Sequence, residues 1–326
     1  YYEYLSLLES KNLALNICSY IGHSALRIWT MGEEAMQREA REDEIIEMEK
    51  IVSDAMRSGA IGFATSTFEG HNGTNGIPMP SRFASKEEVS RLIKAMAIDG
   101  RGIFMLTKSN DTEIKDIIQL LGSVERPTMV AALLDNPMKK SWAYNVLEDI
   151  TKANNKGYEI WGQVSCRPLT MEFTMNEPYM LEGLVAWKDY MIQNTVEDRK
   201  NVLKNQEFRK AVLNEILDTT KNKLFVGNWE KIKLINTKNF SLSKHIGMNL
   251  LDIANFYNKE PFDWLLDNAI NDGFEDLFAA ELLNSDNKQV EKLLKHQYAS
   301  IALSDAGAHT SLLCDAGYAI ELLSKW

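Results

Sequence analysis

Polar side chains stand at the ends of six short apolar runs in this 326-residue chain, where they could form a catalytic or binding site. The last run ends in SDAGAH, whose Asp305 and His309 carry groups that enzymes use as general acids and bases. This stretch is either a turn with polar caps or the mouth of an active site. The polar residues after the other five runs are His23, Ser24 and Arg27; His71; Lys108 and Asp111; Asp135 and Asn136; and Ser165, Cys166 and Arg167.

Each of these residues also has a purely structural interpretation. An aspartate after a strand commonly caps the next helix, and a single loop histidine is more often a structural hydrogen-bonding residue than a ligand. Cys166 is expected to be a small buried hydrophobic residue. A weaker alternative is a hydrolase that uses Cys166 as its nucleophile, although no histidine neighbours it in the sequence. The loop at 68–80 is long enough to favour a function. The shared position of these residues at strand ends is therefore a stronger indication than any one of them.

The elements that would position these residues alternate between strand and helix. Strands are expected at 13–22, 60–66, 102–107, 128–134, 158–165 and 299–305, and their nearly continuous apolar character is typical of parallel strands covered on both faces. The helices between them have recognisable ends: a capping box of Ser85 and Glu88, and the stop glycines Gly59, Gly100 and Gly157. The pattern predicts an α/β fold and favours a (β/α)8 barrel, whose active sites lie at the carboxyl ends of the strands.

The region from about 176 to 298 is helix-rich and polar, which indicates a helical insertion. One strand is expected within it, in WEKIKLIN at 229–236, and is counted as a barrel strand. Seven strands then fall within the chain, so at least one barrel strand is expected before Tyr1. We therefore expect a single domain over 1–326, a barrel incomplete at its N-terminus. The opening YYEYLSLLES, which has no initiator Met, also reads as the middle of a longer protein.

Composition excludes some classes of function. The net charge of −10 gives no indication of a nucleic acid or an anionic membrane as partner, so a small molecule is the expected partner. Cys18, Cys166 and Cys314 are widely spaced, which predicts neither a disulfide framework nor a paired-cysteine zinc site and favours the cytoplasm. No apolar run approaches the roughly 20 residues that span a bilayer. The oligomeric state is not predicted.

Five segments together resemble the N-acyl-D-amino-acid deacylase (D-aminoacylase) branch of the amidohydrolase superfamily. They are YIGHSALRIWTMG, EIIEMEKIVSDAMRSGAIGFATST, SKEEVSRLIKAMAIDG, LLDIANFYNKEPFDWLLD and SDAGAH. The resemblance runs along the chain and is loose between 176 and 245. It implies a metal-dependent (β/α)8 barrel, usually accompanied by a small β-domain, that hydrolyses the C–N amide bond of an N-acyl amino acid or related small molecule.

The resemblance also implies roles for individual residues. Asp305 matches the aspartate that, in this family, contacts the metal and accepts a proton from the metal-bound water. The implied cofactor is one Zn²⁺, which lowers the pKa of that water to near neutrality. The predicted substrate-binding residues are His309, beside that aspartate, and His23, Arg27, Lys108 and Arg167.

The chain departs from the metal ligands of the family. The His-x-His pair of the first barrel strand is absent and is expected before Tyr1. Lys108, in MLTKSND, stands where deacylases place a histidine, and AALLDN lacks the histidine of the next strand. Two interpretations stay open. One is a hydrolase whose other ligands precede this chain, with a carboxylated Lys108 as a conceivable substitute. The other is a catalytically impaired barrel that binds a small ligand without turnover.

Overall fold

The computed structural model describes residues 1–73, 77–218, 220, 223–271, 273–304 and 316–326. The chain divides into two compact units, each assembled from three segments. Unit 1 consists of Tyr1–Leu133, Ala143–Val164 and Leu293–Ala302, and unit 2 of Leu134–Trp142, Ser165–Lys292 and Leu303–Trp326. The expectation of a single barrel domain with a helical insertion stays a prediction.

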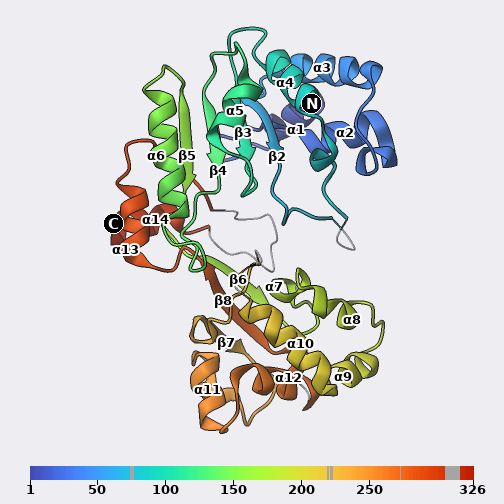
Figure 1. Cartoon of the computed structure of the whole chain (residues 1–326), viewed down its shortest axis with the longest axis vertical. Coiled ribbons are helices and arrows are strands. Elements are labelled where there is room, and N and C mark those ends of the chain that lie inside the picture. The colour runs from blue at the N-terminus through green and yellow to red at the C-terminus, as the bar shows by residue number, and fades with distance from the viewer. Residues whose placement is uncertain (74–76, 219, 221–222, 272, 305–315) are drawn as a thin grey trace. The chain divides into compact units, whose positions relative to one another are not determined.

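Unit 1 is built on a sheet of six strands that all run parallel, which confirms the predicted α/β class (Figure 1). The strands, in their order across the sheet, are β1 (Ile21–Gly22), β2 (Gly62–Ser66), β3 (Ile103–Thr107), β4 (Thr128–Ala131), β5 (Ile160–Val164) and β9 (Ala299–Ile301). All six lie within the predicted runs. The first is much shorter than expected, since 13–20 are not in a strand.

One face of this sheet is closely packed. Phe63, Phe104 and Leu106 are fully buried on it, and the Phe63 and Phe104 rings stack with centroids 6.2 Å apart. Gly162 is needed on the same face because a Cβ there would lie 2.5 Å from Leu147. The helices of this unit are α1 (Tyr2–Ser10), α2 (His23–Met31), α3 (Glu42–Arg57), α4 (Lys86–Met96), α5 (Ile114–Leu121) and α6 (Trp142–Asn154). The side chains of the alternate positions, such as Met105 and Trp161, are only partly buried.

The start of α4 differs in one respect from the predicted capping box. Ser85 caps the helix as expected, and its Oγ accepts a hydrogen bond of 3.1 Å from the Glu88 backbone N–H. The Glu88 carboxylate, however, bonds to His23 and Arg27 rather than completing the box. The capping motif therefore located the helix correctly but concealed the second role of Glu88.

Unit 2 contains a three-stranded antiparallel sheet in the order β6 (Leu169–Phe173), β8 (Leu277–Leu283) and β7 (Ile232–Asn236). The prediction that WEKIKLIN is a barrel strand is wrong, because β7 pairs antiparallel with β8. Burial alternates along β7, with Ile232 and Leu234 buried and Lys233 exposed, which is typical of a half-covered antiparallel strand. The helices from this part of the chain are α7 (Tyr179–Glu182), α8 (Lys188–Met191), α9 (Val196–Lys204), α10 (Gln206–Leu217), α11 (Leu250–Phe256), α12 (Pro261–Asn271), α13 (Asn287–Leu294) and α14 (Tyr318–Lys325).

Candidate functional site

Three hydroxyl side chains and one lysine lie just beyond the carboxyl ends of β2 and β3. We call these residues, Thr67, Lys108, Ser109 and Thr112, the strand-end cluster. Ser66 at the end of β2 is in register with Thr107 at the end of β3. Thr67 Oγ1 accepts the Ser109 N–H at 2.9 Å and lies 3.1 Å from Thr112 Oγ1. Ser109 Oγ lies 2.7 Å from Thr112 Oγ1. Thr67, Ser109 and Thr112 were not among the predicted residues. Of the residues predicted after these two strands, Lys108 belongs to the cluster, whereas His71 Nδ1 lies 2.7 Å from Ser66 Oγ.

Lys108 is the charged member of the strand-end cluster. It is 5% exposed, and its Nζ donates to the Ser109 carbonyl at 2.8 Å. An ammonium group suits the binding of a carboxylate, but it has no lone pair to give to a metal. In this form Lys108 can contribute positive charge and hydrogen-bond donors.

His23 and Arg27 occupy a second site in unit 1, the Glu88 cluster, which consists of His23, Arg27, Thr65 and Glu88. His23 Nε2 lies 2.8 Å from Glu88 Oε1, and Nδ1 lies 2.7 Å from Thr65 Oγ1. Arg27 donates to Glu88 at 2.7 Å and also to the backbone carbonyl of Arg38. Thr65 and Phe63 alternate with Ser66 along β2, so this cluster lies on the closely packed face of the sheet.

Burial decides the protonation of the Glu88 cluster. The His23 ring is wholly enclosed, and this burial lowers its pKa despite the hydrogen bond to Glu88. A neutral His23 can donate from Nε2 to Glu88 while Nδ1 accepts the Thr65 hydroxyl. Burial by itself would raise the pKa of Glu88, but hydrogen bonds from His23 and Arg27 outweigh it and keep that pKa below its usual range. The cluster is therefore a buried carboxylate–guanidinium pair with a neutral imidazole.

Asn284, immediately after β8, joins three distant segments of unit 2, and we call Asp135, Ser165, Arg167 and Asn284 the Asn284 cluster. The Asn284 amide donates to the carbonyls of Ser165 and Arg167, each at 2.8 Å. Its Oδ1 accepts the Asp135 N–H at 3.1 Å, and its own N–H donates to the Asp135 carbonyl at 2.8 Å. The sequence did not indicate Asn284, because it follows a strand that was not predicted.

The side chains of 166 and 167 are also fixed in unit 2. Arg167 Nε lies 3.0 Å from Glu321 Oε2 of α14. The Cys166 thiol is buried, donates to the Tyr318 carbonyl at 3.1 Å, and has its pKa raised by burial. A thiol that is held protonated is a poor nucleophile, which counts against the cysteine mechanism.

Two predicted site residues, Asp305 and His309, lie outside the described residues. Of the other four, His23 and Arg27 meet in the Glu88 cluster, Lys108 belongs to the strand-end cluster, and Arg167 lies in unit 2. Substrate binding by these residues stays a prediction. Within the described ranges, no three His, Cys, Asp or Glu side chains form a group that could hold a metal ion. The described residues alone therefore do not fit the implied Zn²⁺.

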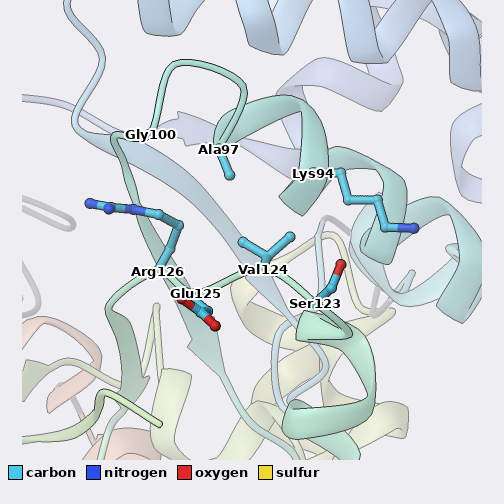
Figure 2. Close-up of a pocket in the computed structure, with 7 residues that line it drawn as sticks. All are labelled: Lys94, Ala97, Gly100, Ser123, Val124, Glu125 and Arg126. Atoms are coloured by element: carbon cyan, nitrogen blue, oxygen red, sulfur yellow. The ribbon is translucent and has the colours of Figure 1, made fainter. Parts of the chain in front are cut away.

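A shallow pocket of about 390 Å³ lies at the opposite ends of the strands of unit 1 (Figure 2). The loops that line it precede β3 and β4 and contain Gly100 and Arg126. Lys94 and Arg126 extend away from one another in Figure 2 and do not converge on a ligand. In parallel α/β sheets ligands bind beyond the carboxyl ends of the strands, so this pocket at the amino ends is not the candidate site.

No protein-family model matches the chain. Among curated proteins, it is 29% identical over 136 residues to D-aminoacylase of Alcaligenes xylosoxydans xylosoxydans, which covers 42% of this chain and 25% of that protein. It is 24% identical over 162 residues to N-acyl-D-glutamate deacylase of the same organism. That alignment covers 48% of this chain and 31% of the deacylase. An uncharacterized protein of Mycobacterium bovis is 23% identical over 99% of this chain and 55% of its own length.

Two solved structures share the fold. A D-aminoacylase matches 92% of this chain and 50% of its own, with a TM-score of 0.52 and 17% identity. An N-acyl-D-glutamate deacylase of Bordetella bronchiseptica, in complex with zinc and a phosphonate inhibitor, matches with a TM-score of 0.52 and 14% identity. This match also covers 92% of this chain and 50% of that protein. This chain thus spans between a quarter and about half of the length of these proteins. The predicted resemblance to the D-aminoacylase branch of the amidohydrolase superfamily is confirmed.

Proposed function

We propose that the protein carrying this chain is a metal-dependent amidohydrolase that cleaves the C–N bond of an N-acyl amino acid or related small molecule. The observation that carries the proposal is the double likeness to D-aminoacylase and N-acyl-D-glutamate deacylase, in sequence and in fold. Both names describe removal of an acyl group from a D-amino acid. The stereochemistry and the acyl group of the present substrate are left open.

We further propose that the six parallel strands of unit 1 belong to a (β/α)8 barrel. The proposal is supported by the uniform strand direction and by the likeness of 92% of the chain to the solved amidohydrolases. In such a barrel the substrate site lies at the carboxyl ends of the strands. The strand-end cluster then lies at that site, and Lys108 offers a cation for the carboxylate of an N-acyl amino acid.

The proposed chemistry assigns a proton-transfer role to Asp305. A Zn²⁺ held by Asp305 and by ligands beyond the described residues would lower the pKa of a water at the site. Asp305 is proposed to be the general base that would take the proton of the attacking water, and its protonated carboxyl would then supply the leaving amine. His309 is proposed beside Asp305 at the substrate. The protein is proposed to act in the cytoplasm. Among the described residues, no helix has the length and apolar character needed to cross a membrane.

The proposal is tested by assaying the full-length protein against a panel of N-acetyl-D-amino and N-acetyl-L-amino acids for released amine. We expect turnover by the wild type and a loss of about 10²-fold or more in kcat for Asp305→Asn. Asp54→Asn, on the exposed face of α3, is the matched control and should retain full activity. If Asp305→Asn retained full activity, Asp305 would not be the general base. If active protein purified without chelator contained no bound metal, the proposed metal dependence would be wrong.

The alternative function is binding of a small ligand without turnover. It is favoured by the donor set at the carboxyl ends of β3 and β4, where Lys108 and Asp135 stand in place of the histidines expected of a deacylase. This function predicts that N-acyl amino acids bind, as measured by calorimetry, and that no amine is released with added Zn²⁺. Measurable amine release that depends on Asp305 would exclude it.

A further inference from the structure

The face of the unit 1 sheet opposite the closely packed one carries a row of polar side chains near the carboxyl ends of its strands. We call this row, which consists of Ser66, Thr107, Gln163 and Ser300, the polar row. Ser66 is in register with Thr107, and Gln163 is in register with Ser300. All four residues are partly buried, and all four belong to unit 1.

The register of the sheet places Gln163 on the same face as Thr107. Met105 of β3 is in register with Met129 of β4, which is in register with Trp161 of β5. Thr107 and Gln163 each stand two residues further along their strands, and side chains two residues apart on a strand share a face. Burial alternates along β5 in agreement, with Trp161 and Gln163 partly exposed and the other three residues buried.

Gln163 has a buried acceptor that no described residue satisfies. Its Oε1 is enclosed, and within the part of the chain that the structure describes no donor lies within hydrogen-bond distance of it. A buried polar atom without a partner destabilises a fold, so native proteins pair nearly all such atoms with protein groups, water or a ligand. An acceptor in this position can pair with an N–H group of a bound molecule.

We infer that Gln163 is a specificity-determining residue whose side-chain carbonyl accepts a hydrogen bond from the amide N–H of an N-acyl amino acid. The inference rests on the proposed amidohydrolase function. Every such substrate has an acyl carbonyl, an amide N–H and a carboxylate, and of these groups only the N–H is a donor. In the proposed barrel the helices lie outside, so the polar row faces the interior near the ends of the strands that form the substrate site. Lys108, next to Thr107, offers its ammonium to the carboxylate of the same substrate.

This role predicts selectivity between amides and esters. The O-acetyl derivative of a 2-hydroxy acid has the shape of an N-acetyl amino acid, with the same carbonyl and carboxylate, but an oxygen replaces the N–H. A site built to hydrogen-bond a substrate N–H discriminates against the analogue that lacks it, because the acceptor is then left unpaired. Loss of the acceptor should therefore weaken hydrolysis of the amide and not of the ester.

The test measures kcat/KM of the full-length wild type, Gln163→Met and Gln163→Glu on an N-acetyl amino acid and on its ester analogue. Methionine has nearly the same length and removes the acceptor, whereas glutamate keeps acceptor oxygens. We expect Gln163→Met to lower kcat/KM about tenfold or more for the amide and less than about threefold for the ester. Gln163→Glu should keep the wild-type ratio of the two within about threefold. Gln119→Met, at an exposed position of α5 in the same unit, is the matched control and should behave as the wild type.

The outcomes separate this inference from the proposed function. If the wild type is active and Gln163→Met loses nothing, or loses the same factor on amide and ester, the inference is overturned and the proposed function stands. A ratio in Gln163→Glu that falls as far as in Gln163→Met would show that the acceptor oxygen is not the group that matters, and would also overturn it. If Gln163→Met does not fold, Gln163→Ala, which removes the same acceptor, decides on the same ratio. A wild type that releases no amine from any N-acyl amino acid would overturn the proposed function and this inference together.

Discussion

The Glu88 cluster of unit 1 and the Asn284 cluster of unit 2 do similar work with different chemistry. Each uses one buried side chain to join residues far apart in the chain: Glu88 meets His23 and Arg27, and Asn284 meets Asp135, Ser165 and Arg167. The first relies on an ion pair and an imidazole, the second on a neutral amide and backbone groups. The comparison teaches that the charged arrangement should be costlier to break and should respond to pH through His23 and Glu88, whereas the Asn284 amide has no titratable group of its own.

Arg27→Met should have the largest effect. It leaves the Glu88 carboxylate buried with His23 as its remaining side-chain partner and removes donors to the carbonyls of Ala35 and Arg38. We expect the free energy of unfolding to fall by about 3–5 kcal/mol, measured by hydrogen exchange of the β2 amides in denaturant. Arg57→Met, which breaks an exposed pair with Asp54, should change it very little. If Arg27→Met and Arg57→Met lost the same free energy of unfolding, the buried pair would be no more important to stability than the exposed one.

Asn284→Gly should have the second largest effect. Loss of the amide leaves buried backbone groups without a partner and should lower the free energy of unfolding by about 1–3 kcal/mol. Asn284→Ala should lose about 1 kcal/mol more, because a Cβ is strained at a φ of +60°. Chemical denaturation of both variants beside Asn258→Gly, a matched control at an exposed position with a φ of +53°, measures the difference. A glycine variant as stable as the wild type would show that the cluster is not a structural junction.

The pH dependence should distinguish the two clusters. Burial lowers the pKa of His23. The unfolded state therefore binds more protons than the folded state between the ordinary histidine pKa of about 6.5 and the lowered value. Stability should fall as the pH drops through that window and, further down, as Glu88 protonates. His23→Gln should flatten the first part of the fall in pH-dependent denaturation, while Asn284→Gly should follow the wild-type slope. If the stability of His23→Gln depended on pH as steeply as that of the wild type, His23 would not be the titrating group.

The smallest effect is expected for the stability of Asp135→Asn. Burial raises the pKa of Asp135, so the folded state binds the extra proton and loses stability as the pH rises through that raised pKa. The amide variant cannot ionise and should be slightly more stable than the wild type at neutral pH. At a pH below the ordinary aspartate pKa the two proteins should converge. Denaturation curves at the two pH values test this, and a less stable variant at neutral pH would contradict it.

Sequence patterns predicted the parallel sheet better than they predicted the sites. Continuous apolar runs and glycine stops located all six strands of unit 1, because strands covered on both faces have an unambiguous composition. The sheet of unit 2 was missed, since β6 and β8 lie among helices and β7 was mistaken for a barrel strand. Glu88 and Asn284 escaped prediction for a related reason. Their partners are 61 to 149 residues away, beyond any local pattern.

The alternation of the two units along the chain has a consequence for synthesis on the ribosome. β5 ends at Val164, but its neighbour β9 begins only at Ala299, after the long middle segment of unit 2 has been made. At a usual elongation rate, this interval lasts roughly seven to twenty-seven seconds. During that time one edge of β5 has no β9 to pair with and is exposed to mispairing with other chains. The emerging polypeptide is therefore most vulnerable to aggregation, and most dependent on chaperones, while residues 165–298 are being translated.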